Sequence, residues 1–216
     1  MRGPEILEKF DRLASGYSQH DYADPARYTR RRAAVATRIG PKLASGALVL
    51  DLACGDANMA RPLLDLGFRY RGADGSPGMV AEAQARLAGA GEVEVGLIES
   101  YAPPEPVDMT LFLRAIPYIE DPTRFFRHVA TYTTTKLVFD VCQRELDPKP
   151  LLASLETAGW SDIVMRPFFL PQRTALPAPL RLAAEALDYS GPLARVAMRF
   201  TGIWFVAARP PRSARE

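Results

Sequence analysis

The feature that most constrains the fold is a regular alternation of short apolar stretches with helical stretches, which begins at residue 47. Strands are expected at the apolar stretches 47–53, 70–73, 93–98, 109–115, 137–141, 163–169 and 203–208. Helices are expected between them at 57–66, 77–87, 121–132 and 148–158. This order predicts a doubly wound α/β fold, in which helices cover both faces of a mostly parallel sheet.

Helices are also expected outside this alternation. Apolar residues recur at helical spacing over 4–15, and Asp24 followed by Pro25 predicts a helix that ends near Ile39. A long, Pro-punctuated segment separates the last two strands, and we expect helices in it after Pro179 and Pro192. The chain is therefore expected to be one domain with a helical lid (1–45), a core (46–170 and 201–209), a cap insertion (171–200) and a tail (210–216).

The composition gives no indication of a nucleic-acid or membrane partner. The formal net charge is +2, and the basic residues are scattered among acidic ones. Cys54 and Cys142 are the two cysteines, which favours a reducing, cytoplasmic location over a disulfide scaffold. The N-terminus lacks the continuous apolar stretch of a signal peptide, and no apolar run approaches the roughly 18 residues of a transmembrane helix. We expect no transmembrane segment. A homodimer is possible, because the sequence does not determine the oligomeric state.

A candidate ligand site lies where the first two expected strands end. Asp51 is followed by the small residues Ala53, Cys54 and Gly55 just before a helix. Small side chains let the backbone approach a ligand closely, and open α/β sheets bind ligands at this edge. The second strand ends in Asp74, whose carboxylate is suited to accept hydrogen bonds from both hydroxyls of a ribose. The sequence therefore predicts a nucleoside site.

Between about residues 10 and 208, the chain resembles the class I S-adenosylmethionine-dependent methyltransferases. Residues 48–57 resemble the first motif of that family, and residues 72–79 resemble the second. The resemblance implies a Rossmann-like, seven-stranded sheet with an antiparallel C-terminal hairpin, S-adenosylmethionine as cofactor and S-adenosylhomocysteine as product. It implies that the turn at 53–57 lies against the methionine part of the cofactor. The cofactor-binding residues expected on this basis are Asp51, Ala53, Cys54, Gly55, Asp74, Gly75, Met79, Glu99, Arg114, Tyr17 and Tyr28.

The chain departs from the family pattern in two places. Ala53 and Ala57 stand where the family usually has glycine, and Gly55 is retained. After the third strand the family usually has an acid that contacts the adenine amine, whereas this chain has Leu97 and Ile98 followed by Glu99. We assign the adenine contact to Glu99.

The candidate groups for the acceptor and for catalysis are few. Arg114 follows an apolar strand and would suit an acidic or phenolate acceptor, with a structural ion pair as an equal alternative. His20 is the candidate general base, with an exposed loop histidine as the alternative. His128 is interpreted as a helix-surface residue. Arg31 and Arg32 are interpreted as a charged helix face, with a contact to a carboxylate as the alternative.

The predicted function is methyl transfer to the O, N or C of a small, hydrophobic metabolite, mainly by proximity and alignment and with no metal. The apolar residues within 171–200 are numerous enough to roof a pocket for such an acceptor. A dinucleotide site is disfavoured because the G-x-G-x-x-G spacing is absent. Two alternatives stay open. One is a non-catalytic S-adenosylmethionine-binding protein, and the other is an RNA methyltransferase, which the lack of a concentrated basic face disfavours.

Overall fold

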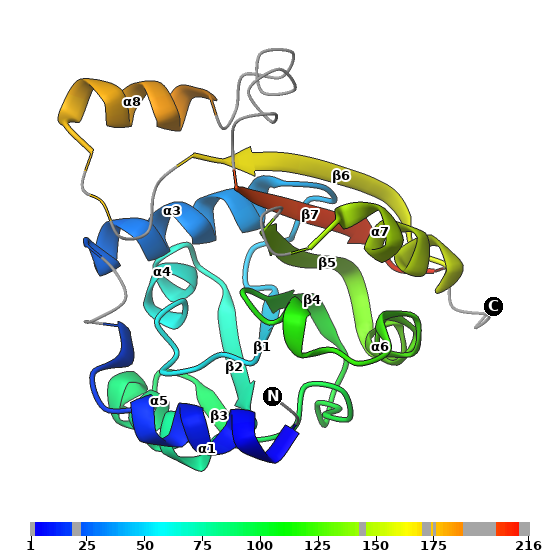
Figure 1. Ribbon diagram of the computed structural model, residues 1–216, viewed down its shortest axis with the longest axis horizontal. Coiled ribbons are helices and arrows are strands. Elements are labelled where there is room, and N and C mark those ends of the chain that lie inside the picture. The colour runs from blue at the N-terminus through cyan, green and yellow to red at the C-terminus, as the bar shows by residue number, and fades with distance from the viewer. Residues whose placement is uncertain are drawn as a thin grey trace.

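The computed structural model describes residues 3–18, 23–142, 146–169, 174, 176–187 and 202–211. Its centre is a seven-stranded sheet with the order β3-β2-β1-β4-β5-β7-β6 (Figure 1). The strands are β1 (Leu48–Leu52), β2 (Arg69–Asp74), β3 (Glu92–Val95), β4 (Val107–Phe112), β5 (Thr133–Cys142), β6 (Ser161–Phe168) and β7 (Ile203–Arg209). The first five strands run parallel, and β7 lies antiparallel to both β5 and β6. The predicted doubly wound sheet with an antiparallel C-terminal hairpin is confirmed.

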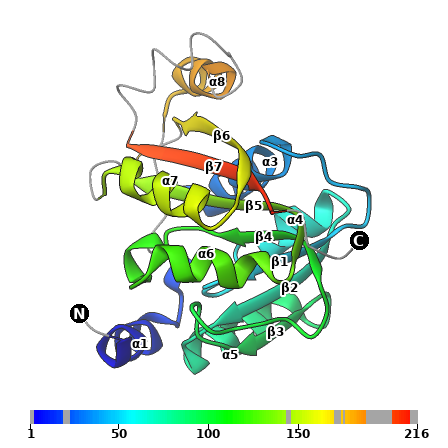
Figure 2. The ribbon, with the colours of Figure 1, turned by 90° about the vertical axis from the view of Figure 1, so that its right-hand side faces the viewer.

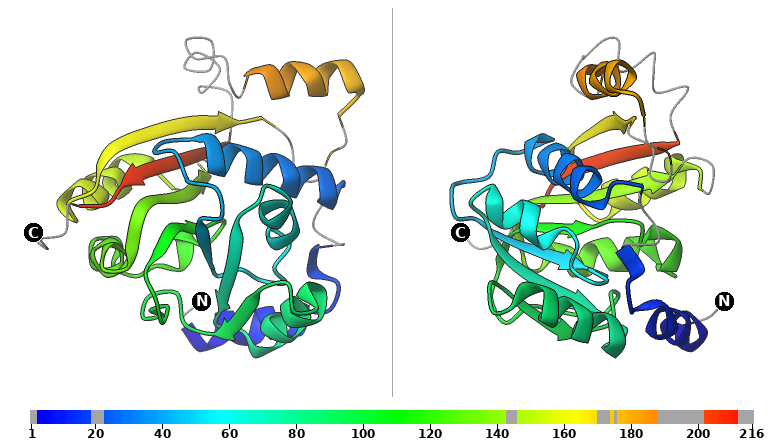
Figure 3. Two further views of the ribbon diagram at one scale, coloured as in Figure 1. Left: turned by 180° about the vertical axis from the view of Figure 1, so that it is seen from behind. Right: turned by 90° about the vertical axis from the view of Figure 1, so that its left-hand side faces the viewer.

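Helices are arranged around this sheet. They are α1 (Gly3–Leu13), α3 (Pro25–Arg38), α4 (Ala60–Asp65), α5 (Pro77–Leu87), α6 (Pro122–Ala130), α7 (Pro148–Thr157), α8 (Ala178–Leu187) and the short 3₁₀ helix η1 (Ile116–Tyr118). One hydrophobic cluster joins the sheet to α3, α4 and α5, and a second joins the opposite face to α6 and α7 (Figures 2 and 3). Because the central strands β1 and β4 are covered on both faces, most of their residues are apolar.

Local sequence signals explain where four of the helices begin. Asp24, Ser76, Asp121 and Asp147 each accept a hydrogen bond from a backbone N–H of the first turn, and each is followed by proline. A side-chain acceptor satisfies one of the unpaired donors at a helix start, and proline has the backbone angle of the first helical position. None of the described helices combines the length and the apolar composition that a bilayer crossing requires.

Several expected boundaries differ from the structure. The strand expected at 109–115 ends at Phe112, and the strand expected at 137–141 begins already at Thr133. The helix expected at 57–66 begins only at Ala60, because the backbone turns through left-handed conformations up to Ala57 (φ 54°). The strand expected at 93–98 ends at Val95, because the chain turns at Gly96, which packs against the ring of Tyr101. In the segment 171–200, α8 forms after Pro177, and the second expected helix lies outside the described residues.

Candidate functional site

A cavity of about 380 Å³ lies at the carboxyl ends of the central parallel strands. The helix α1 closes one side of it with Ile6, Leu7 and Phe10. Most of the predicted site residues line this cavity, namely Tyr17, Asp51, Ala53, Cys54, Gly55, Asp74, Gly75, Met79 and Arg114. The fold therefore brings residues from the lid, from both motifs and from the loop after β4 to one place.

The turn between β1 and α4 has an unusual backbone. Ala53, Gly55 and Ala57 all have positive φ, at 52°, 57° and 54°. Glycine takes this left-handed conformation at little cost, whereas a residue with a Cβ loses roughly 1–2 kcal/mol. The two alanines that depart from the family pattern therefore keep the shape that glycine would give, at an energetic cost. Strain of this kind is typical of sites where the backbone itself contacts a ligand.

The turn and the second motif meet at one carboxylate. The backbone N–H of Gly55 donates to Asp74 Oδ2 at 2.8 Å, and the backbone N–H of Ser76 donates to Oδ1 at 2.9 Å. Each carboxylate oxygen has a second acceptor position, so the pair can also receive two hydroxyl donors from a ligand. Burial raises the pKa of Asp74, and the two N–H donors oppose that shift.

Asp51 is the buried acid of the site. It lies on β1 and accepts a hydrogen bond from the Tyr70 hydroxyl at 3.1 Å. Burial raises the pKa of Asp51 to about 7, although the Tyr70 hydrogen bond and the charge of Arg32 act in the opposite direction. Its carboxyl group therefore changes charge near neutral pH. Burial and the nearby Asp51 and Asp74 raise the pKa of Cys54, which keeps its thiol protonated.

A buried ion pair also lines the cavity. Arg32 Nη2 lies 2.5 Å from Asp140 Oδ2, and both side chains are almost fully buried. The other carboxylate oxygen of Asp140 accepts the backbone N–H of Arg114 at 2.5 Å, which holds Arg114 at a positive φ of 64°. The interpretation of Arg32 as part of a charged helix face is wrong, because Arg32 points into the sheet. Arg31 instead donates to the backbone oxygen of Glu185 on α8 at 2.6 Å.

Some predicted residues lie away from the cavity. Tyr28 is buried in the core, where its ring packs edge-on against Phe168 at 5.4 Å. Glu99 accepts the backbone N–H of Glu120 at 3.0 Å, and its neighbours Leu97 and Ile98 line the cavity instead. His20 lies outside the described residues, so a general base at His20 stays a prediction.

His128 is not simply a residue on the helix surface. Its side chain is half-buried, and Nε2 lies 2.8 Å from the backbone oxygen of Tyr101. This hydrogen bond ties α6 to the loop that follows β3.

Tyr17 was expected at the site, but the aromatic group that it forms with Phe10 and Tyr118 was not predicted. The ring of Phe10 on α1 packs edge-on against Tyr17, at 6.2 Å between centroids, and against Tyr118 of η1, at 5.7 Å. All three side chains line the cavity. The helical spacing of Phe10 predicted that it belongs to the apolar face of its helix. Only the fold shows that this face lines the site.

The middle of the chain matches a known domain family. Residues 49–135 match the family described as methyltransferase domain. The human methyltransferase-like protein 27 is 37% identical over 86 residues, a match that covers 38% of this chain and 35% of that protein. The chain thus aligns with about a third of the length of this curated relative.

Solved structures share the whole fold at low sequence identity. A methyltransferase in complex with the Haloferax volcanii Trm112 methyltransferase activator superposes with a TM-score of 0.67 at 20% identity, over 94% of this chain and 98% of that one. The geranyl diphosphate C-methyltransferase of Streptomyces coelicolor A3(2), bound to S-adenosyl-L-homocysteine, gives 0.65 at 13% identity over 96% and 97%. The [4+2]-cyclase SpnF gives 0.62 at 16% identity over 98% and 97%.

Proposed function

We propose that this chain, which has the fold of the class I S-adenosylmethionine-dependent methyltransferases and matches the methyltransferase domain family over residues 49–135, binds S-adenosylmethionine and transfers its methyl group to a small molecule. The observation that carries the proposal is the hydrogen bond from Gly55 N–H to Asp74 in the wall of one cavity. It joins the turn expected to hold the methionine part to the acid expected to hold the ribose.

The chemistry of the cavity wall supports this cofactor. Asp74 has two acceptor positions for the ribose hydroxyls, as described above. Met79, Leu97 and Ile98 give an apolar surface beside Asp74 on which the flat adenine base would lie. In this proposal hydrophobic contact replaces the acidic adenine contact that was expected at Glu99.

The rest of the cavity suggests the class of acceptor. It is lined by the aromatic group of Phe10, Tyr17 and Tyr118 and by Ile116 and Leu146. A mostly apolar lining favours a small, mostly apolar acceptor. Bound S-adenosylmethionine supplies an electrophilic methyl on a sulfonium, and the residues of the lid and of η1 hold the acceptor in line with it and exclude water. Alignment of this kind contributes roughly 7–11 kcal/mol in well-oriented systems.

We predict that Asp74→Ala weakens S-adenosylmethionine binding at least tenfold, because the two ribose hydroxyls lose a charged acceptor, and each such bond contributes roughly 1.5–3 kcal/mol. Titration calorimetry measures the affinity. Asp65→Ala is the matched control, because Asp65 is an exposed acid on α4 paired with Arg61. Equal affinity in the parent and in Asp74→Ala would refute the ribose assignment.

Mass spectrometry of the purified protein tests the cofactor directly, because carried-over S-adenosylmethionine or S-adenosylhomocysteine is expected in it. Turnover is then assayed over a panel of apolar acceptors. Cofactor binding without turnover across the panel would favour the non-catalytic alternative. Retention of RNA that weakens as salt is raised would favour the RNA methyltransferase.

A second prediction concerns pH and follows from Asp51. Since burial raises its pKa to about 7, this cavity-lining carboxyl group gains negative charge as the pH rises from 6 to 8. S-adenosylmethionine carries a sulfonium charge that S-adenosylhomocysteine lacks, so the affinity for the first relative to the second should rise severalfold over this range. Calorimetry with both ligands at each pH measures the ratio. In Asp51→Asn the ratio should stay flat, and a flat ratio in the parent would contradict the prediction.

A further inference from the structure

The lid helix α1 lies against the start of α5, at two glycines of the second motif (Figure 1). A Cβ at Gly75 would stand 2.7 Å from Leu7 Cδ2. A Cβ at Gly78 would stand 3.1 Å from Asp11 Oδ1 and 3.3 Å from Ala14 Cβ. Gly78 lies inside a helix, where glycine is less favourable than alanine. Gly78 therefore serves here to let α1 approach α5 closely.

One carboxylate fixes this contact. Asp11 Oδ1 accepts the Ser76 hydroxyl at 2.5 Å and the backbone N–H of Gly78 at 2.9 Å. These two hydrogen bonds lower the pKa of Asp11, so the group is a carboxylate at neutral pH. A negative charge is favourable at the N-terminus of a helix such as α5, which has 11 residues.

The same serine also holds the candidate ribose acid. Ser76 is fully buried, and its hydroxyl oxygen caps α5 by accepting the backbone N–H of Met79 at 3.1 Å. Its own backbone N–H donates to Asp74. Asp11 is therefore connected to Asp74 through one residue. On the neighbouring face of α1, Ile6 and Phe10 line the cavity.

We propose that Asp11 is a positioning residue that latches α1 over the bound nucleoside and thereby slows its release. This inference rests on the proposed cofactor site. Asp11 and Gly78 do not belong to the described lining of the cavity, so they act on the ligand through the position of α1 and Ser76. Release of the ligand past α1 requires both hydrogen bonds of Asp11 to break.

The test is the dissociation rate of S-adenosylhomocysteine from the full chain, measured by surface plasmon resonance. In Asp11→Ala we expect dissociation about tenfold faster, because two hydrogen bonds to a charged acceptor are lost, with little change in the association rate. Asp11→Asn keeps an amide oxygen as acceptor, so its dissociation rate should lie between those of the parent and of Asp11→Ala. The matched control is Glu8→Ala, an exposed acid on the same helix, which should dissociate at the parent rate.

Gly78→Ala separates a latch from a general stabilising role. Alanine favours the helical conformation of α5, but its methyl group crowds Asp11 and Ala14. We therefore expect faster dissociation with no fall in the melting temperature. If the parent chain binds S-adenosylhomocysteine and both Asp11→Ala and Gly78→Ala release it at the parent rate, the latch is overturned. If the parent does not bind it at all, the proposed function fails first, and the latch fails with it.

Discussion

Arg32→Met is expected to lower the free energy of unfolding by about 3–5 kcal/mol, because it leaves Asp140 buried without its counter-charge. Arg32 and Asp140 are each at most 3% exposed, and their atoms lie 2.5 Å apart. The guanidinium also lies 5.5 Å from the ring centroid of Tyr28 and 5.9 Å from that of Phe205. Methionine can fill most of this space, so the expected loss comes mainly from the charge and not from a cavity.

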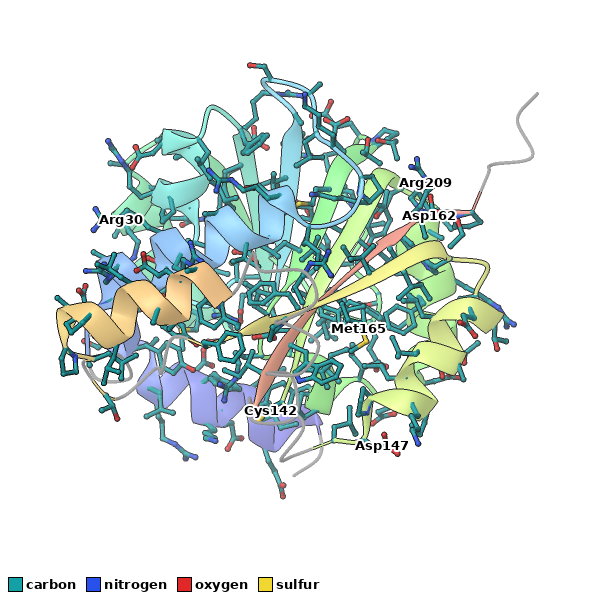
Figure 4. All side chains as sticks on the ribbon, turned by 90° about the horizontal axis from the view of Figure 1, so that it is seen from above. Arg30, Cys142, Asp147, Asp162, Met165 and Arg209 are labelled. Atoms are coloured by element: carbon teal, nitrogen blue, oxygen red, sulfur yellow. The ribbon has the colours of Figure 1, made fainter. Side chains whose placement is uncertain are left out.

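Urea unfolding at neutral pH measures this effect. Arg30→Met is the matched control, because Arg30 lies two residues away on α3 but is exposed at the outer edge of the molecule (Figure 4). Its effect should stay within about 0.5 kcal/mol. Adding Asp140→Asn to Arg32→Met should recover part of the loss, because the buried charge is then removed. Equal stability of Arg32→Met and Arg30→Met would show that the pair contributes nothing.

Arg32→Met should also affect the candidate site. Asp140 holds the backbone N–H of Arg114, and Arg114 lines the cavity at a positive φ. Without Arg32, the Asp140 carboxylate is no longer fixed from the side of α3. The wall that faces the acceptor is then less well defined, and turnover should fall more than cofactor binding does.

The fold and the position of the site could be predicted because their signals are local. Alternating apolar periods placed the strands, and aspartate followed by proline marked helix starts at Asp24 and Asp121. Parallel strands bring their carboxyl ends to one edge, so residues at the ends of β1 and β2 had to meet. The structure accordingly places Gly55 within hydrogen-bond distance of Asp74.

The pair of Arg32 and Asp140 could not be predicted in the same way, because its members are 108 residues apart. In a run of three arginines, only one can face the sheet, since each residue turns the helix by about 100°. A signal was nevertheless present. Arg32 is in phase with Tyr28, Val35 and Ala36 on the buried face of α3. The position of Glu99 outside the cavity lining has a different reason, because it depends on where β3 ends, and strand ends are set by packing.

Lys136→Met is the second large prediction, with an expected loss of about 3 kcal/mol in the free energy of unfolding. Lys136 lies on β5 and is fully buried. Its ammonium group donates to the backbone oxygens of Ala36, Thr37 and Ile39 at 3.1, 2.8 and 2.9 Å. The last carbonyls of a helix have no partner within it, and a positive charge is favourable there. The lysine therefore caps α3 from the sheet, and methionine would leave these acceptors buried and unpaired.

Urea unfolding again gives the measurement, and Lys149→Met, which replaces an exposed lysine on α7, is the control. A loss below about 0.5 kcal/mol in Lys136→Met would contradict the capping role.

The pH dependence of this loss tests the same site independently. Burial lowers the pKa of Lys136 from 10.5 to about 8. Between these two values the unfolded chain binds more protons than the native chain, so the contribution of this residue to stability rises with pH. This contribution to stability is fully present above the pKa of the lysine in the unfolded chain, and it is lost as the pH falls through about 8, the pKa in the native chain. The difference in unfolding free energy between the parent and Lys136→Met should therefore widen from pH 8 to pH 10. If it narrows instead, the three carbonyls stabilise the ammonium form by more than burial disfavours it.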